Sequence, residues 1–277
     1  MTGVRGEPAI CWRLRNSGHA AGSRPAGTSD EAGSARAVRE MFDRIAPRYD
    51  LLNHVLSCNV DRLWWRRTAR RFRHILARPQ ARVLDICCGT GDMTMALLQF
   101  RPAQAEPPAE LIIAADFAPA MLERARKKLA GRGARVIEAD ALHLPMADGS
   151  LDLITTAFGF RNLANYQAGL EEFFRVLRPD GEVGILDFSE PGGIVGKLYA
   201  FYFRRVLPAV GDLISGGRGA YGYLPESVER FPEPPAMLEM MRQAGFVDVE
   251  WTPYSFGIAG LWRGVKPERG NGTGRTG

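Results

Sequence analysis

Cysteine is scarce in this sequence, and its spacing excludes the common structural uses of cysteine. The four cysteines are Cys11, Cys58, Cys87 and Cys88. They form no Cys-x-x-Cys pair and no Cys/His cluster with zinc spacing, so a zinc-stapled fold is excluded and we predict no metal site. We expect the adjacent Cys87 and Cys88 to be small buried residues of a protein in a reducing compartment.

Long apolar runs are missing as well. No run is long enough to cross a bilayer, and the first residues lack the continuous apolar core of a secretory signal. Residues 1–35 are broken by glycine and proline, so we interpret them as a disordered leader, and residues 267–277 as a disordered tail. We therefore predict a cytoplasmic protein with one ordered domain over residues 36–266.

Negative charge is in short supply relative to positive charge. The chain has 36 Lys and Arg residues against 31 Asp and Glu residues, which gives a net charge of +5. Much of the excess lies in residues 61–78, DRLWWRRTARRFRHILAR. Such a segment can contact nucleic acid, an acidic membrane surface or an anionic ligand, and the alternative is a solvated helix face.

The sequence does contain a regular alternation of strand and helix patterns. Helical patterns begin at Ala37 and Asp61 and form an N-terminal cap over residues 36–78. An aromatic insertion at residues 191–235 precedes a last helix and two antiparallel strands within 247–266. This order predicts an α/β fold with a mostly parallel seven-stranded sheet and an antiparallel edge hairpin. The other expected strands are 81–88, 109–116, 134–140, 151–160 and 182–191, and the helix between the last two is expected at 166–181.

The segment VLDICCGTGDMT, residues 83–94, has the pattern of a nucleotide-binding strand, turn and helix. Gly89, Thr90 and Gly91 form the turn, and Thr94 stands where a dinucleotide-binding fingerprint has its third glycine. Asp85 lies at the strand end, where a carboxylate repels a pyrophosphate but suits a cationic ligand. These features favour S-adenosylmethionine, with its amino group and sulfonium, as the ligand. The alternative ligand is a nicotinamide dinucleotide, and with it the protein would be an oxidoreductase.

Two more of the predicted strands end in carboxylates. Asp116 is placed to accept hydrogen bonds from two ribose hydroxyls. Asp140, followed by Ala141, can bond the exocyclic amine of adenine, and Ala157 at the end of the fourth strand completes the predicted cofactor site. A single Asp of this kind is often only a helix cap or turn former. Three of them at one sheet edge indicate one ligand.

The same motifs resemble those of a known family. LDICCGTGD, AADFAPAMLERARKK and EADALHLPMADGSLDLITTAFGFRN look like successive motifs of class I S-adenosylmethionine-dependent methyltransferases. FDRIAPRYDLLNHVLSCNVDRLWWR, FGFRN and RVLRPDGEVGILDFSEP are similar to the ubiquinone/menaquinone biosynthesis C-methyltransferases, and the resemblance covers about residues 37–266. The chain departs from that family at Cys87 and Asp180, where glycine is common, and at Asp187, where Glu is common.

The resemblance implies a Rossmann-like fold, S-adenosylmethionine as methyl donor, and methylation of a ring carbon of a polyprenylated hydroquinone. Arg161 and Asn162 follow the fourth strand, beside the expected place of the methyl group, where a guanidinium can hold a phenolate oxygen. The alternative is a structural Arg161 that bonds a loop carbonyl. We expect Tyr49 and Asp50 to close over the ligands from the cap, and Asp50 or His54 to be the candidates for the base.

Several alternatives stay open. CCGTGD looks more like the menaquinone branch of the family, but the ubiquinone branch, or both, fits the remaining motifs. A module that binds S-adenosylmethionine without transferring its methyl group, or an enzyme for another small aromatic acceptor, is a further alternative. Nucleic acid is not expected as a partner, because AFGFRN stands where base N-methyltransferases carry an Asn/Asp-Pro-Pro-aromatic motif.

Two features suit a lipid environment. The apolar and aromatic insertion at residues 191–235 can line a groove for a prenyl chain. Arg66, Arg67, Arg70 and Arg71 can touch acidic lipid head groups, so we expect peripheral contact with an anionic membrane surface at the inner face of the plasma membrane. A homodimer is also compatible with the sequence.

Overall fold

The structure is a computed structural model that describes residues 22–25, 27–46, 59–102, 111–189, 191 and 223–268. Its helices are α1 (Glu31–Ile45), α3 (Val60–Arg71), α4 (Arg73–Leu76), α5 (Asp92–Leu98), α6 (Pro119–Leu129), α7 (Tyr166–Val176), α10 (Tyr223–Arg230) and α11 (Pro234–Gln243). Two short 3-10 helices, η2 (Phe160–Asn162) and η4 (Ser255–Gly257), complete them. No helix in these ranges is long and apolar enough to cross a membrane.

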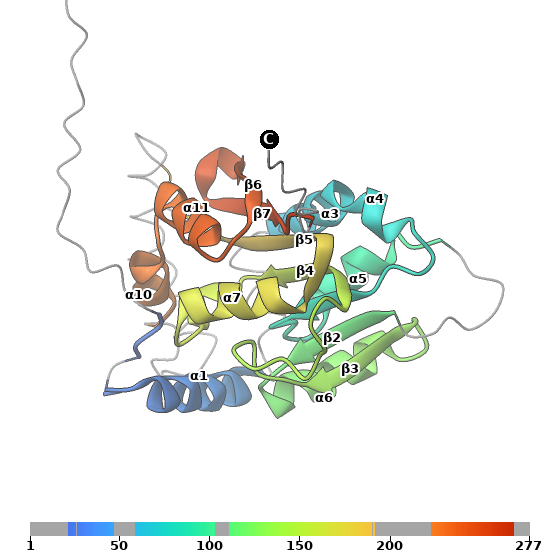
Figure 1. The fold of residues 1–277 in the computed structure, drawn as a ribbon. Helices are drawn as coiled ribbons and strands as arrows, with labels where there is room; N and C mark the ends of the chain where they lie inside the picture. Colours follow the sequence, from blue (N-terminus) through green and yellow to red (C-terminus); the bar gives the residue numbers. More distant parts are fainter. Residues whose placement is uncertain are drawn as a thin grey trace, which may run out of the picture.

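A seven-stranded sheet forms the centre of the molecule, in the order β3-β2-β1-β4-β5-β7-β6 (Figure 1). All neighbouring strands from β3 to β5 run parallel, whereas β7 is antiparallel to both β5 and β6. The predicted mostly parallel sheet with an antiparallel edge hairpin is therefore confirmed. The strands are β1 (Val83–Ile86), β2 (Ile112–Asp116), β3 (Ala134–Glu138), β4 (Leu151–Ala157), β5 (Leu177–Phe188), β6 (Val247–Tyr254) and β7 (Ala259–Val265).

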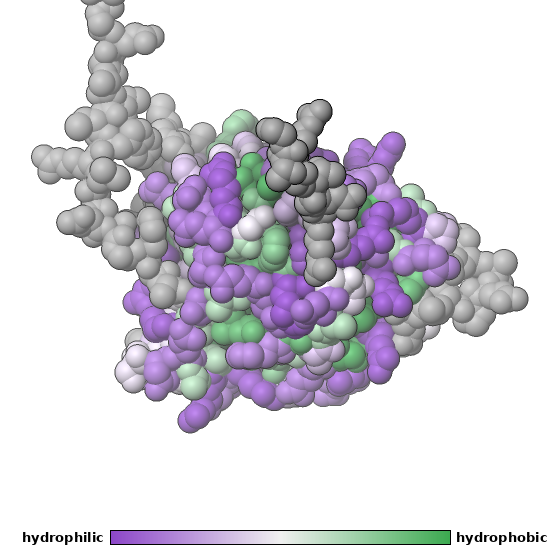
Figure 2. All heavy atoms as spheres, in the orientation of Figure 1, coloured by the Kyte–Doolittle hydropathy of each residue, from purple (hydrophilic) through white to green (hydrophobic). Residues whose placement is uncertain are grey.

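Helices cover both faces of this sheet because its strands are apolar on both sides. Leu84 and Ile86 of β1 pack toward α7 and α11, in one large cluster that includes Phe173 and Met241. Val83 belongs to a second cluster with α3, α4 and α5 on the opposite face. Hydrophilic residues cover much of the face drawn in Figure 2, which includes α7, as expected of helices whose apolar sides face the sheet.

The order of the strands fixes where a ligand can bind. The chain moves from β1 outward to β2 and β3, then returns to place β4 on the other side of β1. The loops that follow β1 and β4 therefore diverge, and open parallel sheets bind ligands at such a reversal, beyond the carboxyl ends of the strands.

Two predicted boundaries differ from the structure. The helical pattern was expected to begin at Ala37, after a leader ending at residue 35, but α1 begins at Glu31. Asp30 starts it earlier, because its side chain accepts a hydrogen bond from the Gly33 amide and caps the helix. Chain N-terminal to α1 also packs on the body: Ser23 is buried and donates to the Leu163 carbonyl.

The second difference lies between α7 and β5. The helix expected over 166–181 ends at Val176, and β5 begins at Leu177, which pairs with Leu151. A register shift follows, and within it Asp180 has a φ of 60° and donates its amide to the Lys266 carbonyl. This left-handed conformation is the one that glycine adopts without strain. Most of the insertion predicted at residues 191–235 lies outside the described residues.

Candidate functional site

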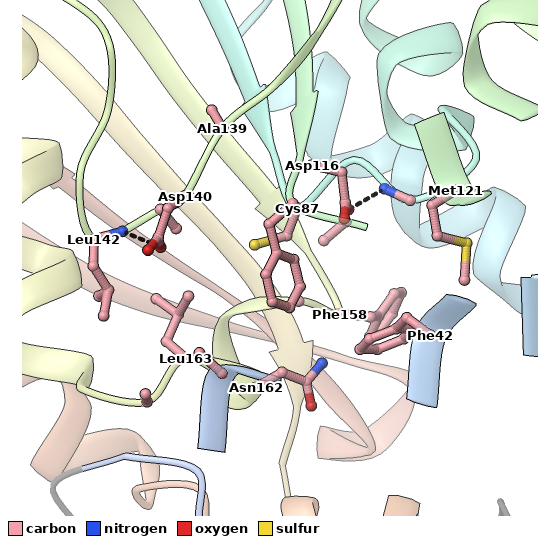
Figure 3. Close-up of a pocket in the computed structure, with 17 residues that line it drawn as sticks. Phe42, Cys87, Asp116, Met121, Ala139, Asp140, Leu142, Phe158, Asn162 and Leu163 are labelled. Carbon is pink, nitrogen blue, oxygen red and sulfur yellow. Dashed lines mark hydrogen bonds between the residues drawn. The ribbon is translucent and has the colours of Figure 1, made fainter. Parts of the chain in front are cut away.

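A cavity lies at the carboxyl ends of β1, β2 and β4, where the strand order reverses (Figure 3). Its lining comes from the sheet loops, from α1 and from the start of α6. In Figure 3, Asp140 and Leu142 lie on one side, Asp116 and Met121 on the other, and Asn162 below. The described lining residues are Ala35, Phe42, Cys87, Gly89, Asp116, Phe117, Met121, Ala139, Asp140, Ala141, Leu142, Ala157, Phe158, Gly159, Asn162, Leu163 and Ala164.

The turn after β1 shapes the floor of this cavity. Cys87, Gly89 and Gly91 have φ values of 55°, 54° and 92°, so the chain turns through left-handed conformations. Cys87 stands where glycine is common in the resembled family, and its backbone explains that preference. A Cβ atom on Gly159 would lie 2.3 Å from the Cβ of Cys87, so only glycine lets the β4 loop approach the β1 turn this closely.

Asp116, at the end of β2, is a buried carboxylate that lines the cavity. Its Oδ2 accepts a hydrogen bond from the Gly89 amide at 2.9 Å, and its Oδ1 accepts one from the Ala118 amide at 2.9 Å. Burial raises the pKa of Asp116, and these amide hydrogen bonds act in the opposite direction. Each carboxylate oxygen has a second lone pair, so Asp116 can still accept hydrogen bonds from a ligand.

Asp140 lines the cavity from the loop after β3, and its side chain is 52% exposed. Its Oδ1 accepts a hydrogen bond from the Leu142 amide at 2.9 Å, which leaves Oδ2 toward solvent and His143. Ala141 and Ala157, also expected at the cofactor site, line the same cavity. Five of the eight predicted cofactor residues thus line the cavity: Gly89, Asp116, Asp140, Ala141 and Ala157.

The other three predicted cofactor residues do not line the cavity. They are Asp85, Thr90 and Gly91. Asp85 is fully buried and accepts hydrogen bonds from the hydroxyls of Thr94 at 2.5 Å and Thr155 at 3.0 Å. Thr90 accepts a hydrogen bond from the Lys128 ammonium at 2.9 Å. Gly91 packs against Leu129 and precedes α5. Asp85 thus bonds side chains of α5 and β4 and does not line the cavity, and its contact with a cationic ligand stays a prediction.

Arg161 also lies apart from the cavity. Its side chain is 6% exposed, and its guanidinium donates to Asp187 Oδ1 at 3.0 Å and to the Phe158 carbonyl. The Arg161 amide donates to Asp187 Oδ2 at 3.1 Å. The guanidinium is thus held by a buried ion pair and by the Phe158 carbonyl, and a bond to a loop carbonyl is the structural alternative considered for this residue. Asn162, the next residue, does line the cavity and is buried.

Helix α1 supplies a wall that the sequence did not predict. Ala35 and Phe42 line the cavity, and Phe42 packs with Phe117 and Met121. The Ala120 amide donates to Asp43 Oδ1 at 3.1 Å, which fixes α1 against the start of α6. In the sequence, Phe42 is only one apolar position of a helix, so nothing distinguishes it from a core residue. The predicted Tyr49 and Asp50 lie outside the described residues.

The buried carboxyl of Asp85 gives stability a distinctive pH dependence. Burial raises its pKa to about 7, and the hydrogen bonds from Thr94 and Thr155 oppose the rise. The folded protein then holds a proton that the unfolded chain has released, so this contribution to stability is complete below about pH 4 and is lost as pH rises to about 7.

We expect Asp85→Asn to remove that dependence. Urea unfolding from about pH 4.5 to pH 8 should show wild-type stability falling relative to the variant by up to about 1.4 kcal/mol per pH unit. Asp148→Asn, at a carboxylate that is 77% exposed, is the control and should track the wild type. Parallel curves for wild type and Asp85→Asn would contradict the assignment.

The Arg161–Asp187 pair should be costly to break from one side. Arg161→Met leaves a buried carboxylate without its partner, and we expect a loss of about 3–5 kcal/mol in the free energy of unfolding. The double variant Arg161→Met/Asp187→Leu should lose less than the sum of the single losses. Arg242→Met, in an exposed pair with Glu239, should change stability by less than about 1 kcal/mol. Equal losses for Arg161→Met and Arg242→Met would refute a supporting role for the buried pair.

Comparison with known proteins agrees with this geometry. The model of the ubiE/COQ5 methyltransferase family matches residues 29–266. A demethylmenaquinone methyltransferase of Deinococcus radiodurans is 48% identical, over 86% of this chain and 95% of its own. A ubiquinone/menaquinone biosynthesis C-methyltransferase UbiE of Geobacter sulfurreducens is 40% identical, over 83% and 88%.

Solved structures show the same fold at lower identity. An S-adenosylmethionine-dependent methyltransferase of Thermotoga maritima, described as a possible histamine N-methyltransferase, covers 82% of this chain and 98% of its own, with a TM-score of 0.56 and 19% identity. At that identity the likeness concerns the fold alone, whereas the family match covers nearly all the described residues. This chain belongs to the ubiE/COQ5 methyltransferase family.

Proposed function

We propose that this protein transfers a methyl group from S-adenosylmethionine to a ring carbon of a polyprenylated hydroquinone, converting demethylmenaquinol to menaquinol. The name of the Deinococcus radiodurans relative supports the menaquinone acceptor. A second acceptor, the methoxybenzoquinol precursor of ubiquinone, is favoured by the Geobacter sulfurreducens relative, whose name covers both pathways.

The observation that carries the proposal is the position of Asp116 in the cavity. It is a buried carboxylate beside a glycine turn, with lone pairs left for two ribose hydroxyls. Asp140 has a partly exposed carboxylate for the adenine amine, and Phe117, Met121 and Leu142 are apolar residues that suit the faces of a flat base. The described residues therefore fit the nucleoside part of S-adenosylmethionine.

The cofactor, when bound, supplies an electrophilic methyl group on a sulfonium. The acceptor must present an electron-rich ring carbon, so the protein has to favour the phenolate of the quinol and hold its ring in line. Asn162 lines the cavity next to Phe158 and Gly159, and its amide can donate a hydrogen bond to the acceptor oxygen. Arg161 acts as a positioning residue, because its ion pair with Asp187 holds the loop that carries Asn162.

Removal of the phenolic proton needs a base beyond these residues. Asp50 and His54 remain our candidates from the front segment, in agreement with the family motif that they belong to. The ring proton displaced by the new methyl group leaves in the last step, which restores the aromatic ring and regenerates the quinol.

The acceptor assay comes first. Purified protein and S-adenosylmethionine should be mixed under reducing conditions with demethylmenaquinol or with the methoxybenzoquinol, each with a short prenyl chain, and the products read by mass spectrometry. We expect a mass gain of one methyl group with demethylmenaquinol. Methylation of the benzoquinol alone would move the protein to the ubiquinone pathway. Absence of product with both quinols, while S-adenosylmethionine binding is intact, would refute a quinol acceptor.

Two variants should separate cofactor binding from acceptor chemistry. Asp116→Asn loses ribose acceptor capacity, so the KM for S-adenosylmethionine should rise at least about tenfold, since hydrogen bonds to charged groups contribute about 1.5–3 kcal/mol. Asn162→Ala should lower kcat about tenfold or more and leave cofactor affinity nearly unchanged. Unchanged cofactor affinity in Asp116→Asn would overturn the ribose assignment, and equal effects of Asn162→Ala on both constants would make that residue structural.

A further inference from the structure

The basic segment singled out in the sequence forms helix α3, and only part of its charge is paired. Arg67 lies with its Cζ 4.4 Å from the centre of the Tyr254 ring, and Arg71 pairs with Glu250 at 2.5 Å. Arg62, Arg66 and Arg70 are exposed and four residues apart, so they share one side of the helix. None of these three guanidinium groups has an ion pair within the described part of the chain.

Apolar side chains are exposed beside that row of arginines. Leu63 on α3 is 62% exposed and Phe256 in η4 is 86% exposed, and among the described residues only Val247 is a comparable exposed apolar side chain. Their chain neighbours are in contact, because the Trp64 indole donates to the Ser255 hydroxyl at 2.9 Å. We call Arg62, Leu63, Arg66, Arg70 and Phe256 the α3 face.

The backbone around Phe256 is held in an uncommon conformation. Ser255, Phe256 and Gly257 have φ values of 47°, 61° and 90°. Such conformations cost a residue with a side chain about 1 kcal/mol or more, so surrounding bonds must maintain them. Ser189 provides two: its hydroxyl donates to the Gly257 carbonyl at 2.7 Å, and its amide donates to the Ile258 carbonyl at 3.0 Å. The turn therefore presents a large aromatic side chain to solvent from a fixed support.

Helix α3 approaches the cavity with its buried side, through Trp64. The Trp64 ring lies 5.8 Å from the ring of Phe158, which lines the cavity, and 6.3 Å from that of Phe188. Aromatic contacts therefore connect α3 with the loop where the acceptor is expected.

We propose that the α3 face is the surface by which this protein docks on an anionic lipid membrane. Arginine side chains are attracted to acidic head groups, and exposed Leu and Phe side chains enter the boundary between head groups and acyl chains. The inference rests on the proposed function insofar as a polyprenylated acceptor resides in a membrane. It differs from the sequence expectation in its residues: Arg67 and Arg71 are held by the protein, while Leu63 and Phe256 join the face.

Vesicle sedimentation tests the proposal with the full chain. The vesicles contain equal parts of phosphatidylglycerol and phosphatidylcholine, with pure phosphatidylcholine as reference. We expect salt-sensitive binding to the anionic vesicles, weakened about tenfold or more by Arg66→Glu/Arg70→Glu and about tenfold by Phe256→Ser. Phe256→Leu keeps an apolar side chain on the same strained backbone and should retain most of the binding. Arg126→Glu, at an exposed position on α6, should bind as the wild type does.

Methylation of a short-chain, water-soluble quinol separates this inference from the proposed function. The α3-face variants should methylate that quinol at the wild-type rate, because none of the changed residues lines the cavity. Wild-type protein that methylates the quinol but does not bind anionic vesicles, or variants that bind as well as wild type, would overturn the docking surface alone. Binding of a single-stranded oligonucleotide, lost in the same variants and without vesicle binding, would overturn it in favour of nucleic acid.

Discussion

The buried ion pair between Arg161 and Asp187 is the interaction on which the rest of the site depends. It joins residues 26 positions apart and fastens the loop after β4 to the end of β5. The same loop carries Phe158, Gly159 and Asn162 along the cavity. The Arg161 guanidinium also lies 5.3 Å from the centre of the Phe188 ring, so the pair anchors the aromatic side chains between the cavity and α3. Arg161, predicted to touch a substrate, is thus buried beside the cavity loop and does not line the cavity.

The sequence predicted the sheet, its hairpin and the edge that carries the cavity, because strand and helix periodicities and the order of elements are local properties. It placed Asp116 and Asp140 at the cavity for the same reason, since neighbouring parallel strands end at one edge. Asp85 does not line the cavity, because alternation along β1 turns its side chain toward Thr94 of α5. Arg161 could not be placed, since its partner Asp187 is distant in sequence. Phe42 was missed because only the fold brings α1 over the cavity.

Glycine turns, helix α1 and exposed residues of α3 and η4 contribute to the cavity and its surroundings in different ways. Glycine positions set how closely the loops approach: Gly159 admits the Cys87 side chain, and Gly89 gives its amide to Asp116. Helix α1 closes the side left open by the sheet and is fixed there by Asp43 and by the ion pair of Arg39 with Glu138. Exposed residues of α3 and η4 then form the surface proposed to contact a membrane. The family match indicates the type of reaction. The glycine turns and helix α1 explain how this chain forms a cavity for its ligands.

The positions of the site residues along the chain have a consequence for the order in which parts of the site are made. Every described residue that lines the cavity lies between positions 35 and 164, so all of them leave the ribosome before β5, β6 and β7. Asp187 follows later and gives Arg161 its partner, and Ser255 comes later still and reaches Trp64. During synthesis, which proceeds from the N-terminus, the described residues of the cavity are thus complete before Asp187, which holds their loop, and before the η4 residues that contact α3.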